Sequence, residues 1–146
     1  MVAKWSMLIF AKAILAGEPI KLFNYGKMRR DFTYIDDVSH AVVSLIDRPP
    51  KSRPGAPADP ATSGAPWKIY NVGNNRPEDL MDVVSPLERE FGRTAIKEML
   101  PMQTGDVEAT FADISELERD IGFRPSTPVN EGIARFAKWY REYHRA

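Results

Sequence analysis

The chain has 146 residues, of which 43% are hydrophobic and 27% charged, so it is long enough for one globular domain with a buried core. Its 20 basic and 20 acidic side chains cancel, which excludes attraction to nucleic acid or a membrane surface through net charge. It has no cysteine, which excludes disulfides and thiolate catalysis and fits a cytoplasmic location, and no apolar run approaches the roughly 20 residues that span a bilayer.

The first predicted element is an amphipathic helix that ends at Gly17. Its apolar residues recur at the spacing of one helix face: Met7, Leu8, Ala11, Ile14 and Leu15. We expect the chain to start inside this helix, with no cap before it. We therefore expect the chain to be part of a longer polypeptide.

Two short strands and a helix are predicted next. The first strand covers residues 19–24 and ends in a turn, and the second covers residues 28–35, where alternate residues face opposite sides. Asp36 or Asp37 is expected to cap a helix that runs to about Asp47, because negative charge is favourable at a helix N-terminus. The expected buried stripe of that helix consists of Val38, Ala41, Val42 and Leu45.

Residues 48–66 contain six of the twelve prolines, which predicts a mobile surface loop. The β-forming residues 67–73 then predict a strand. Asn75 is expected to cap the following helix, with Glu78 as its capping-box partner and Gly92 as its end. The expected apolar side of this helix consists of Leu80, Met81, Val83, Val84 and Leu87.

A short strand over residues 95–100 and two helices complete the chain. The first helix is expected to have Asp113 as its cap, Glu116 as the box partner and Gly122 as its end. Thr127-Pro128 opens the second, with the proline at the first helical position. Its expected inward stripe consists of Ile133, Phe136, Ala137 and Tyr140. These strands are too few for a self-sufficient doubly wound sheet, which predicts an α/β lobe that packs against another part.

Three stretches carry a family resemblance: RRDFTYIDDV at 29–38, YNVGNN at 70–75 and LPMQTGDVEATFADISELERDIGFRP at 100–125. In this order they resemble the C-terminal part of extended short-chain dehydrogenase/reductases that act on nucleotide sugars, and bacterial UDP-glucuronate 4-epimerases most closely. The resemblance covers essentially the whole chain. It implies an α/β fold in which residues 1–146 form the UDP-sugar-binding lobe of a Rossmann-type NAD(P)-binding enzyme, without the N-terminal dinucleotide-binding core.

The resemblance implies that Arg30 binds the pyrophosphate of the substrate. A planar, permanently charged guanidinium suits this role because it can donate two hydrogen bonds to phosphate at once. Residue type alone favours the alternative that Arg30 is a surface strand arginine paired with Asp31, and the motif context reverses this. Arg29 is expected to be a solvated neighbour. The family reads uracil through backbone groups at the positions of Lys21 and Phe23, although Phe23 could also be a core aromatic residue.

The stretch MQTGDV resembles a family loop that contacts the phosphates and the ribose. Gln103 lies at the phosphate position and Asp106 at the position that accepts a hydrogen bond from a ribose hydroxyl. Many relatives have arginine in place of Gln103. A neutral amide adds no charge, so we expect the phosphates to depend more heavily on Arg30. The alternative is that Gly105-Asp106 is simply a turn.

The motifs that carry the family's chemistry are absent from the sequence. It contains no G-x-x-G-x-x-G or G-x-G-x-x-G turn for NAD and no Tyr-x-x-x-Lys pair for proton transfer. We therefore predict no catalytic residue, no cofactor-binding residue and a chain that is catalytically incompetent alone, with NAD bound only in the intact enzyme. No metal site is predicted, because His40 and His144 have no partner at ligand spacing.

Three alternative functions remain open, and one partner is expected. The chain could be a stand-alone, non-enzymatic nucleotide-sugar-binding module, a purely structural domain, or part of a nucleotide-sugar dehydratase or decarboxylase of the same superfamily. As a partner we expect the missing NAD-binding domain. Without it, an exposed apolar face around residues 69–72 would be covered by self-association.

Overall fold

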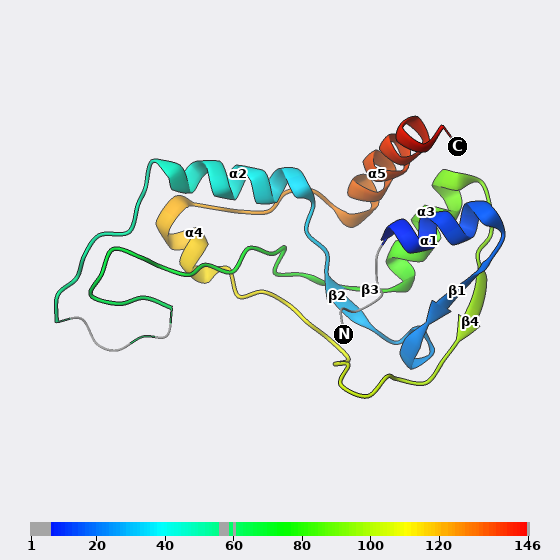
Figure 1. The fold of residues 1–146 in the computed structure, drawn as a ribbon, viewed down its shortest axis with the longest axis horizontal. Helices are drawn as coiled ribbons and strands as arrows, with labels where there is room; N and C mark the ends of the chain where they lie inside the picture. The colour runs from blue at the N-terminus through cyan, green and yellow to red at the C-terminus, as the bar shows by residue number, and fades with distance from the viewer. Residues whose placement is uncertain (1–6, 56–58, 60, 146) are drawn as a thin grey trace. The chain divides into compact units, whose positions relative to one another are not determined.

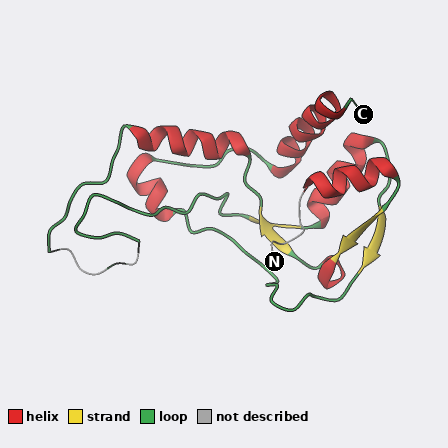
Figure 2. Ribbon diagram, viewed as in Figure 1, coloured by secondary structure: helices red, strands yellow, loops and turns green. Residues whose placement is uncertain are grey.

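The computed structural model describes residues 7–55, 59 and 61–145, which fall into two compact units. Unit 1 contains residues 1–30, 77–110 and 127–146, and unit 2 contains residues 31–76 and 111–126 (Figure 1). The elements in chain order are α1 (Met7–Ala16), β1 (Pro19–Leu22), the 3-10 helix η1 (Phe23–Gly26), β2 (Arg29–Asp31), α2 (Ile35–Ile46), β3 (Pro77–Asp79), α3 (Met81–Phe91), β4 (Ile96–Met99), α4 (Ser115–Ile121) and α5 (Val129–His144). The fold is mixed α/β, as predicted, and Figure 2 shows that its strands are short.

Unit 1 is built on a parallel strand pair and three helices. β1 pairs with β4 from Pro19 opposite Ile96 to Leu22 opposite Met99, and the long connection that parallel strands require contains α3. α3 packs against both α1 and α5. The core side chains of the unit include Phe10, Ile14, Ile20, Leu22, Val83, Val84, Leu87, Ile133 and Ala137.

The predicted end of α1 is confirmed, but its predicted buried face was partly wrong. Gly17 adopts the left-handed conformation, with φ of 70°, directly after the helix. Leu8 is 45% exposed, whereas Phe10 and Ala13 are buried. Apolar residues surround most of this helix, so their spacing alone did not identify the face that packs. The missing cap concerns residues 1–6, which lie outside the described part of the chain.

The second strand and the start of α2 differ from the prediction. β2 ends at Asp31, four residues earlier than expected, and Tyr34 occupies the N-cap position of α2. Neither Asp36 nor Asp37 is the cap, although both lie in the first turn, where their charge still favours the helix. Val42 is exposed rather than buried, while Ala41 is fully buried.

The largest error concerns residues 67–73, which form no strand. Within the described residues this segment makes only an isolated bridge, from Lys68 to Thr62. Asn75 caps no helix: β3 follows it, and α3 begins after Leu80. The predicted end of α3 at Gly92 is confirmed, as are the β4 strand and the burial of the apolar side of α3.

The last two helices lie close to their predicted positions. α4 ends at Gly122, as predicted. Its N-cap position is Ile114, but the Asp113 carboxylate accepts hydrogen bonds from the Ser115 amide at 2.9 Å and hydroxyl at 2.6 Å. Pro128 occupies the N-cap position of α5, one residue before the predicted place. The inward stripe of α5 is buried at Ile133, Ala137 and Tyr140, and Phe136 is half-buried.

Unit 2 has a small core between α2, α4 and the extended segment 67–73. Its buried members are Ala41, Ile114, Leu117 and Phe123, and the half-buried Leu45, Tyr70 and Val72 pack against them. Of the three apolar or aromatic residues at 69–72, Ile69 is 60% exposed, whereas Tyr70 and Val72 are half-buried. In the 48–66 loop, the Gly64 carbonyl accepts from the Arg53 amide at 3.0 Å, and the mobility of this loop stays a prediction.

Asp31 joins three segments of unit 2. Its carboxylate accepts hydrogen bonds from the backbone amides of Asn74 at 2.9 Å, Asn75 at 3.0 Å and Ala112 at 2.9 Å. Gly73 allows this close approach: a Cβ atom there would lie 2.4 Å from the Ala112 Cβ and 2.8 Å from Asp31 Oδ2. The motifs RRDF and YNVGNN therefore meet at one structural junction.

Candidate nucleotide-sugar pocket

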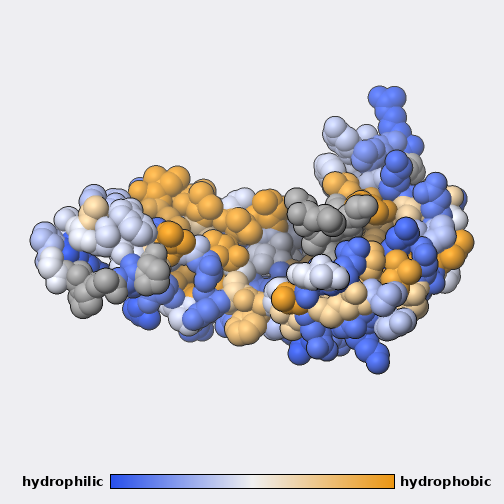
Figure 3. All heavy atoms as spheres, turned by 60° about the horizontal axis from the view of Figure 1, so that its bottom comes forward, coloured by the Kyte–Doolittle hydropathy of each residue, from blue (hydrophilic) through white to orange (hydrophobic). Residues whose placement is uncertain are grey.

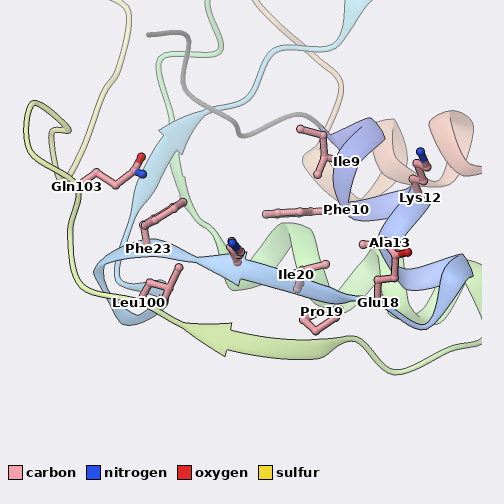
Figure 4. A pocket seen from close by; sticks show the side chains of 11 residues that line it. Ile9, Phe10, Lys12, Ala13, Glu18, Pro19, Ile20, Phe23, Leu100 and Gln103 are labelled. Carbon is pink, nitrogen blue, oxygen red and sulfur yellow. The ribbon is translucent and has the colours of Figure 1, made fainter.

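Unit 1 contains a cavity of about 700 Å³ between α1, β1, η1 and the loop that follows β4 (Figure 4). Figure 4 shows the rings of Phe10, from α1, and Phe23, from η1, pointing toward one another across it. The cavity is lined by Ile9, Phe10, Lys12, Ala13, Glu18, Pro19, Ile20, Lys21, Phe23, Leu100 and Gln103. It combines apolar walls with a few polar groups, the usual character of a small-molecule site.

Three of the five predicted site residues line this cavity: Lys21, Phe23 and Gln103. Lys21 is the exposed residue of β1 between the buried Ile20 and Leu22, and both Ile20 and Lys21 line the cavity. Gln103 lies on the loop after β4 and extends toward the cavity in Figure 4. Residues far apart in the sequence thus meet here because β1 and β4 are paired.

Arg30 does not line the cavity but contacts the same loop. Its Nη1 donates to the backbone carbonyls of Arg29 at 2.7 Å and Glu108 at 3.1 Å. The loop is also held to β2 through its backbone, because the Arg29 amide donates to the Glu108 carbonyl and the Thr110 amide to the Arg29 carbonyl. Within the described residues, Arg30 has no ion pair, and its Nε and Nη2 make no hydrogen bond.

Asp106 also lies outside the cavity lining, and its loop contains the turn that was the alternative prediction. The Asp106 amide donates to the Gln103 carbonyl at 3.1 Å, and Gly105 has φ of 88°. The Oδ2 atom of Asp106 is buried and has no hydrogen-bond partner among the described residues. Burial of a carboxylate oxygen without a donor is costly, so this atom is suited to accept a hydrogen bond from a ligand.

Arg29 is exposed to solvent, as expected, but it also has partners in the fold. Its Nε lies 3.3 Å from Asp79 Oδ1, and its Nη2 donates to the Pro77 carbonyl at 3.0 Å. It therefore ties β2 to β3. The two adjacent arginines have different structural roles, since Arg29 binds β3 and Arg30 binds the loop.

The sequence analysis missed several residues of the cavity, among them Phe10, Lys12 and Leu100. Phe10 and Lys12 lie on α1, where the predicted buried stripe excluded them. Leu100 directly follows β4. The available signal was the apolar character of α1 on nearly every side, which favours packing or binding on two faces.

A polar cluster in unit 2 holds segment 67–73 against α4. Lys68 Nζ lies 2.6 Å from Asp120 Oδ2 and also pairs with Glu116, while the Tyr70 hydroxyl donates to Asp120 Oδ2 at 2.6 Å. The hydrogen bonds from Lys68 and Tyr70 lower the pKa of Asp120, and burial together with Asp120 raises the pKa of Tyr70. Burial alone would lower the pKa of Lys68, but hydrogen bonds to Asp120 and Glu116 outweigh it and raise that pKa. The role of this cluster is structural.

No group of acidic or histidine side chains in the described residues could hold a metal ion. No helix in the described part of the chain is long and apolar enough to cross a membrane.

The comparison with known sequences finds a matching family model for part of the chain. Residues 6–73 match the sequence model of the NAD dependent epimerase/dehydratase family. Similar proteins include Protein CapI of Staphylococcus aureus, 42% identical over 93% of this chain, and the probable UDP-glucuronate 4-epimerase of Rhizobium meliloti, 44% identical over 93% of this chain. Residues 6–73, just under half of the chain, resemble the NAD dependent epimerase/dehydratase family.

Solved structures of this family share the fold. The Y149F mutant of a UDP-glucuronic acid 4-epimerase from Bacillus cereus, in complex with a fluorinated UDP-sugar and NAD, matches 92% of this chain with a TM-score of 0.72 and 25% identity. MoeE5 in complex with UDP-glucose and NAD matches 93% with a TM-score of 0.75 and 25% identity. The chain covers 38% and 41% of these two structures, and about two fifths of the length of the curated relatives.

The described residues do not fit the NAD site that the family name implies. Such a site needs a glycine-rich turn that leads into a helix N-terminus. In the described chain, Gly17, Gly92 and Gly122 instead end helices in the left-handed conformation. We therefore assign no NAD contact to the described residues.

Proposed function

We propose that this chain is the UDP-sugar-binding portion of an NAD-dependent nucleotide-sugar epimerase of the UDP-glucuronate 4-epimerase type, with UDP-glucuronate or UDP-galacturonate as ligand. The observation that carries the proposal is the cavity of unit 1, where Lys21, Phe23 and Gln103 line one site. The similarity to a probable UDP-glucuronate 4-epimerase, 44% over nearly the whole chain, supports this choice of substrate.

The uracil ring occupies the apolar part of the cavity, beside Phe23 and the backbone of Lys21. Gln103 then donates its amide to the phosphates, and Asp106 Oδ2 accepts from a ribose hydroxyl. Arg30 binds the pyrophosphate through Nε and Nη2, the edge of the guanidinium that suits bidentate contact and has no partner among the described residues. The carbonyls of Arg29 in β2 and Glu108 in the loop, which accept from Nη1, position this edge.

The chemical step requires groups that the sequence lacks. We propose that NAD and the general base are supplied by a further polypeptide region, in the cytoplasm, and that this chain alone is catalytically incompetent. A nucleotide-sugar dehydratase is the second candidate, favoured by the family description, which covers both reactions. Both candidates need the same nucleotide contacts, so the binding test below applies to each.

The test is a calorimetric titration of the purified chain with UDP. Arg30→Ala should weaken binding by about tenfold or more, because a hydrogen bond to a charged group contributes roughly 1.5–3 kcal/mol. Lys27→Ala is the matched control. Lys27 is exposed, and its substitution removes the same positive charge three positions away. Absence of binding at millimolar UDP, or an equal loss in both variants, would refute the proposal for this chain.

A further inference from the structure

The turn that follows β1 has a backbone conformation that L-residues rarely adopt. Asn24, Tyr25 and Gly26, all within η1, have positive φ angles of 49°, 53° and 79°. Glycine accepts the left-handed conformation without steric cost and asparagine accepts it occasionally, but for a bulky residue such as tyrosine it is an outlier. The backbone of Tyr25 is therefore strained, and its surroundings have to impose this conformation.

Exposure does not explain why Tyr25 is held in this way. Its side chain is 58% exposed, but other large hydrophobic side chains are exposed as well, among them those that gather over α2 in Figure 3. Single exposed side chains of this kind are common in folded proteins. The informative feature of Tyr25 is its backbone conformation.

Four hydrogen bonds hold the turn. Within it, the Lys27 amide donates to the Asn24 carbonyl at 2.9 Å, and the Asn24 side-chain amide donates to the Lys27 carbonyl at 2.8 Å. Toward β4, the Tyr25 amide donates to the Leu100 carbonyl and the Leu100 amide donates to the Leu22 carbonyl, both at 2.9 Å. Asn24 thus closes the turn with its main chain and its side chain. A glycine at this position would permit the same turn but would not fix it.

The turn connects two residues that line the cavity of unit 1, Phe23 and Leu100. The two backbone groups of Leu100 are bonded to Leu22, just before Phe23, and to Tyr25, just beyond it. Figure 4 shows Phe23 and Leu100 at the same end of the cavity. The conformation of the turn therefore determines how these two residues are placed against one another.

We infer that Asn24 is a positioning residue of the cavity, which holds the left-handed turn and thereby fixes Phe23 and Leu100 as one rigid wall. Asn24 does not itself line the cavity, so it acts through these two residues. A wall that is already ordered loses little freedom when a ligand binds, which favours affinity. That this ligand is a UDP-sugar rests on the proposed function, whereas the hydrogen bonds of the turn do not.

The first measurement is amide hydrogen exchange of the chain without ligand. Asn24→Val should accelerate exchange of the Tyr25 and Leu100 amides at least about tenfold, because a β-branched residue fits a left-handed backbone poorly. Asn24→Gly keeps the conformation and loses only the side-chain bond, so we expect about threefold. The Val84 amide, which donates to the Leu80 carbonyl, should exchange as in the parent and shows that unit 1 remains folded.

The second measurement is a calorimetric titration of the variants with UDP. Asn24→Val should weaken binding at least about fivefold and Asn24→Gly about twofold, since the wall must then be ordered during binding. Asn75→Val is the matched control, because Asn75 is also an asparagine with a positive φ, 53°, but belongs to unit 2 and does not line the cavity. It should lower the urea midpoint of unfolding and leave the affinity for UDP within about twofold.

A third variant separates the turn from the Tyr25 ring. Tyr25→Gly removes the ring but accepts the left-handed backbone, so the affinity for UDP should stay within about twofold of the parent. A loss equal to that of Asn24→Val would identify the ring as the important group and overturn the inference.

Two other results would also overturn it. One is unchanged exchange of the Tyr25 and Leu100 amides in Asn24→Val, and the other is an equal loss of UDP binding in Asn24→Val and Asn75→Val. If the parent chain binds no UDP at millimolar concentration, the proposed function fails. The exchange measurement still decides in that case whether Asn24 holds the wall of the cavity.

Discussion

Gly73→Ala should destabilise unit 2 by about 3 kcal/mol, because the added methyl group has no space. Its Cβ would lie 2.4 Å from the Ala112 Cβ and 2.8 Å from Asp31 Oδ2, whereas carbon atoms pack at about 3.5–4.0 Å. The φ of Gly73 lies outside the left-handed region, so backbone strain contributes nothing to this cost.

The magnitude follows from what must move. Relief of the clash separates residue 73 from Ala112 by more than about 1 Å. That movement breaks or lengthens the hydrogen bond from the Ala112 amide to the Asp31 carboxylate, which at 2.9 Å is a charge-assisted contact. Such a bond contributes about 1.5–3 kcal/mol, and overpacking adds about 1–3 kcal/mol if the segments do not separate fully.

Urea unfolding followed by NMR resonances of unit 2, such as those of Ala41 and Leu117, would measure the loss. Gly64→Ala is the control, because its nearest neighbour is the Arg53 carbonyl at 3.4 Å, and we expect a change below about 0.5 kcal/mol. Adding Ala112→Gly to Gly73→Ala removes the shortest contact and should recover part of the stability. The reasoning is refuted by a Gly73→Ala variant as stable as the parent, or by a double variant no more stable than the single one.

Two further predictions concern buried polar groups. Lys68→Met should cost unit 2 about 1–2 kcal/mol at neutral pH, because Asp120 and Glu116 lose their partner in a partly exposed cluster. Because the pKa of Asp120 is lowered, this group stabilises the fold above its ordinary pKa of 3.8, and the stabilisation is lost as the pH falls through the folded value. Because the pKa of Tyr70 is raised, this group stabilises the fold below its ordinary pKa of 10.0, and that stabilisation is lost as the pH rises through the folded value. The difference between parent and Lys68→Met in urea unfolding should therefore shrink below about pH 4, and a pH-independent difference would contradict this assignment. Asp106→Asn should leave stability unchanged or raise it, since Oδ2 has no donor among the described residues, while UDP binding weakens about fivefold or more; a loss of stability without a loss of binding would mean that Asp106 is only structural.

Helix ends were predictable from the sequence because a local conformation decides them. Gly17, Gly92 and Gly122 each follow the last helical residue with a positive φ, which glycine adopts without steric cost. The start of α2 was less predictable. Tyr34 takes the N-cap position although Asp36 and Asp37 are the better capping residues, because the buried Asp37 carboxylate instead accepts hydrogen bonds from Ser126, far along the chain.

Strand formation over residues 67–73 could not be decided by the sequence, since a strand requires a neighbour as well as a composition. Lys68, Tyr70 and Val72 alternate toward the unit as they would in a strand, but the predicted strand is not formed. Only the pairing is missing from the described residues. The alternation of side chains is a local property of the sequence, whereas hydrogen-bonded pairing of a strand depends on a second strand beside it.

In the candidate site, too, residue positions were easier to predict than the contacts of their side chains. The paired strands bring Lys21 and Gln103 to one cavity, and their roles there stay a prediction. Motifs do not specify side-chain direction, and Arg30 turns its Nη1 to the carbonyls of Arg29 and Glu108. Those carbonyls are neutral, so the positive charge of Arg30 has no counter-ion in the described chain, while Asp106 Oδ2 on the same loop has no donor. A ligand that carries both phosphate and hydroxyl groups would satisfy the cation and the carboxylate together, whereas a simple anion would satisfy only the first. Binding of UDP should therefore depend on both Arg30 and Asp106, whereas binding of inorganic pyrophosphate should depend on Arg30 but not on Asp106.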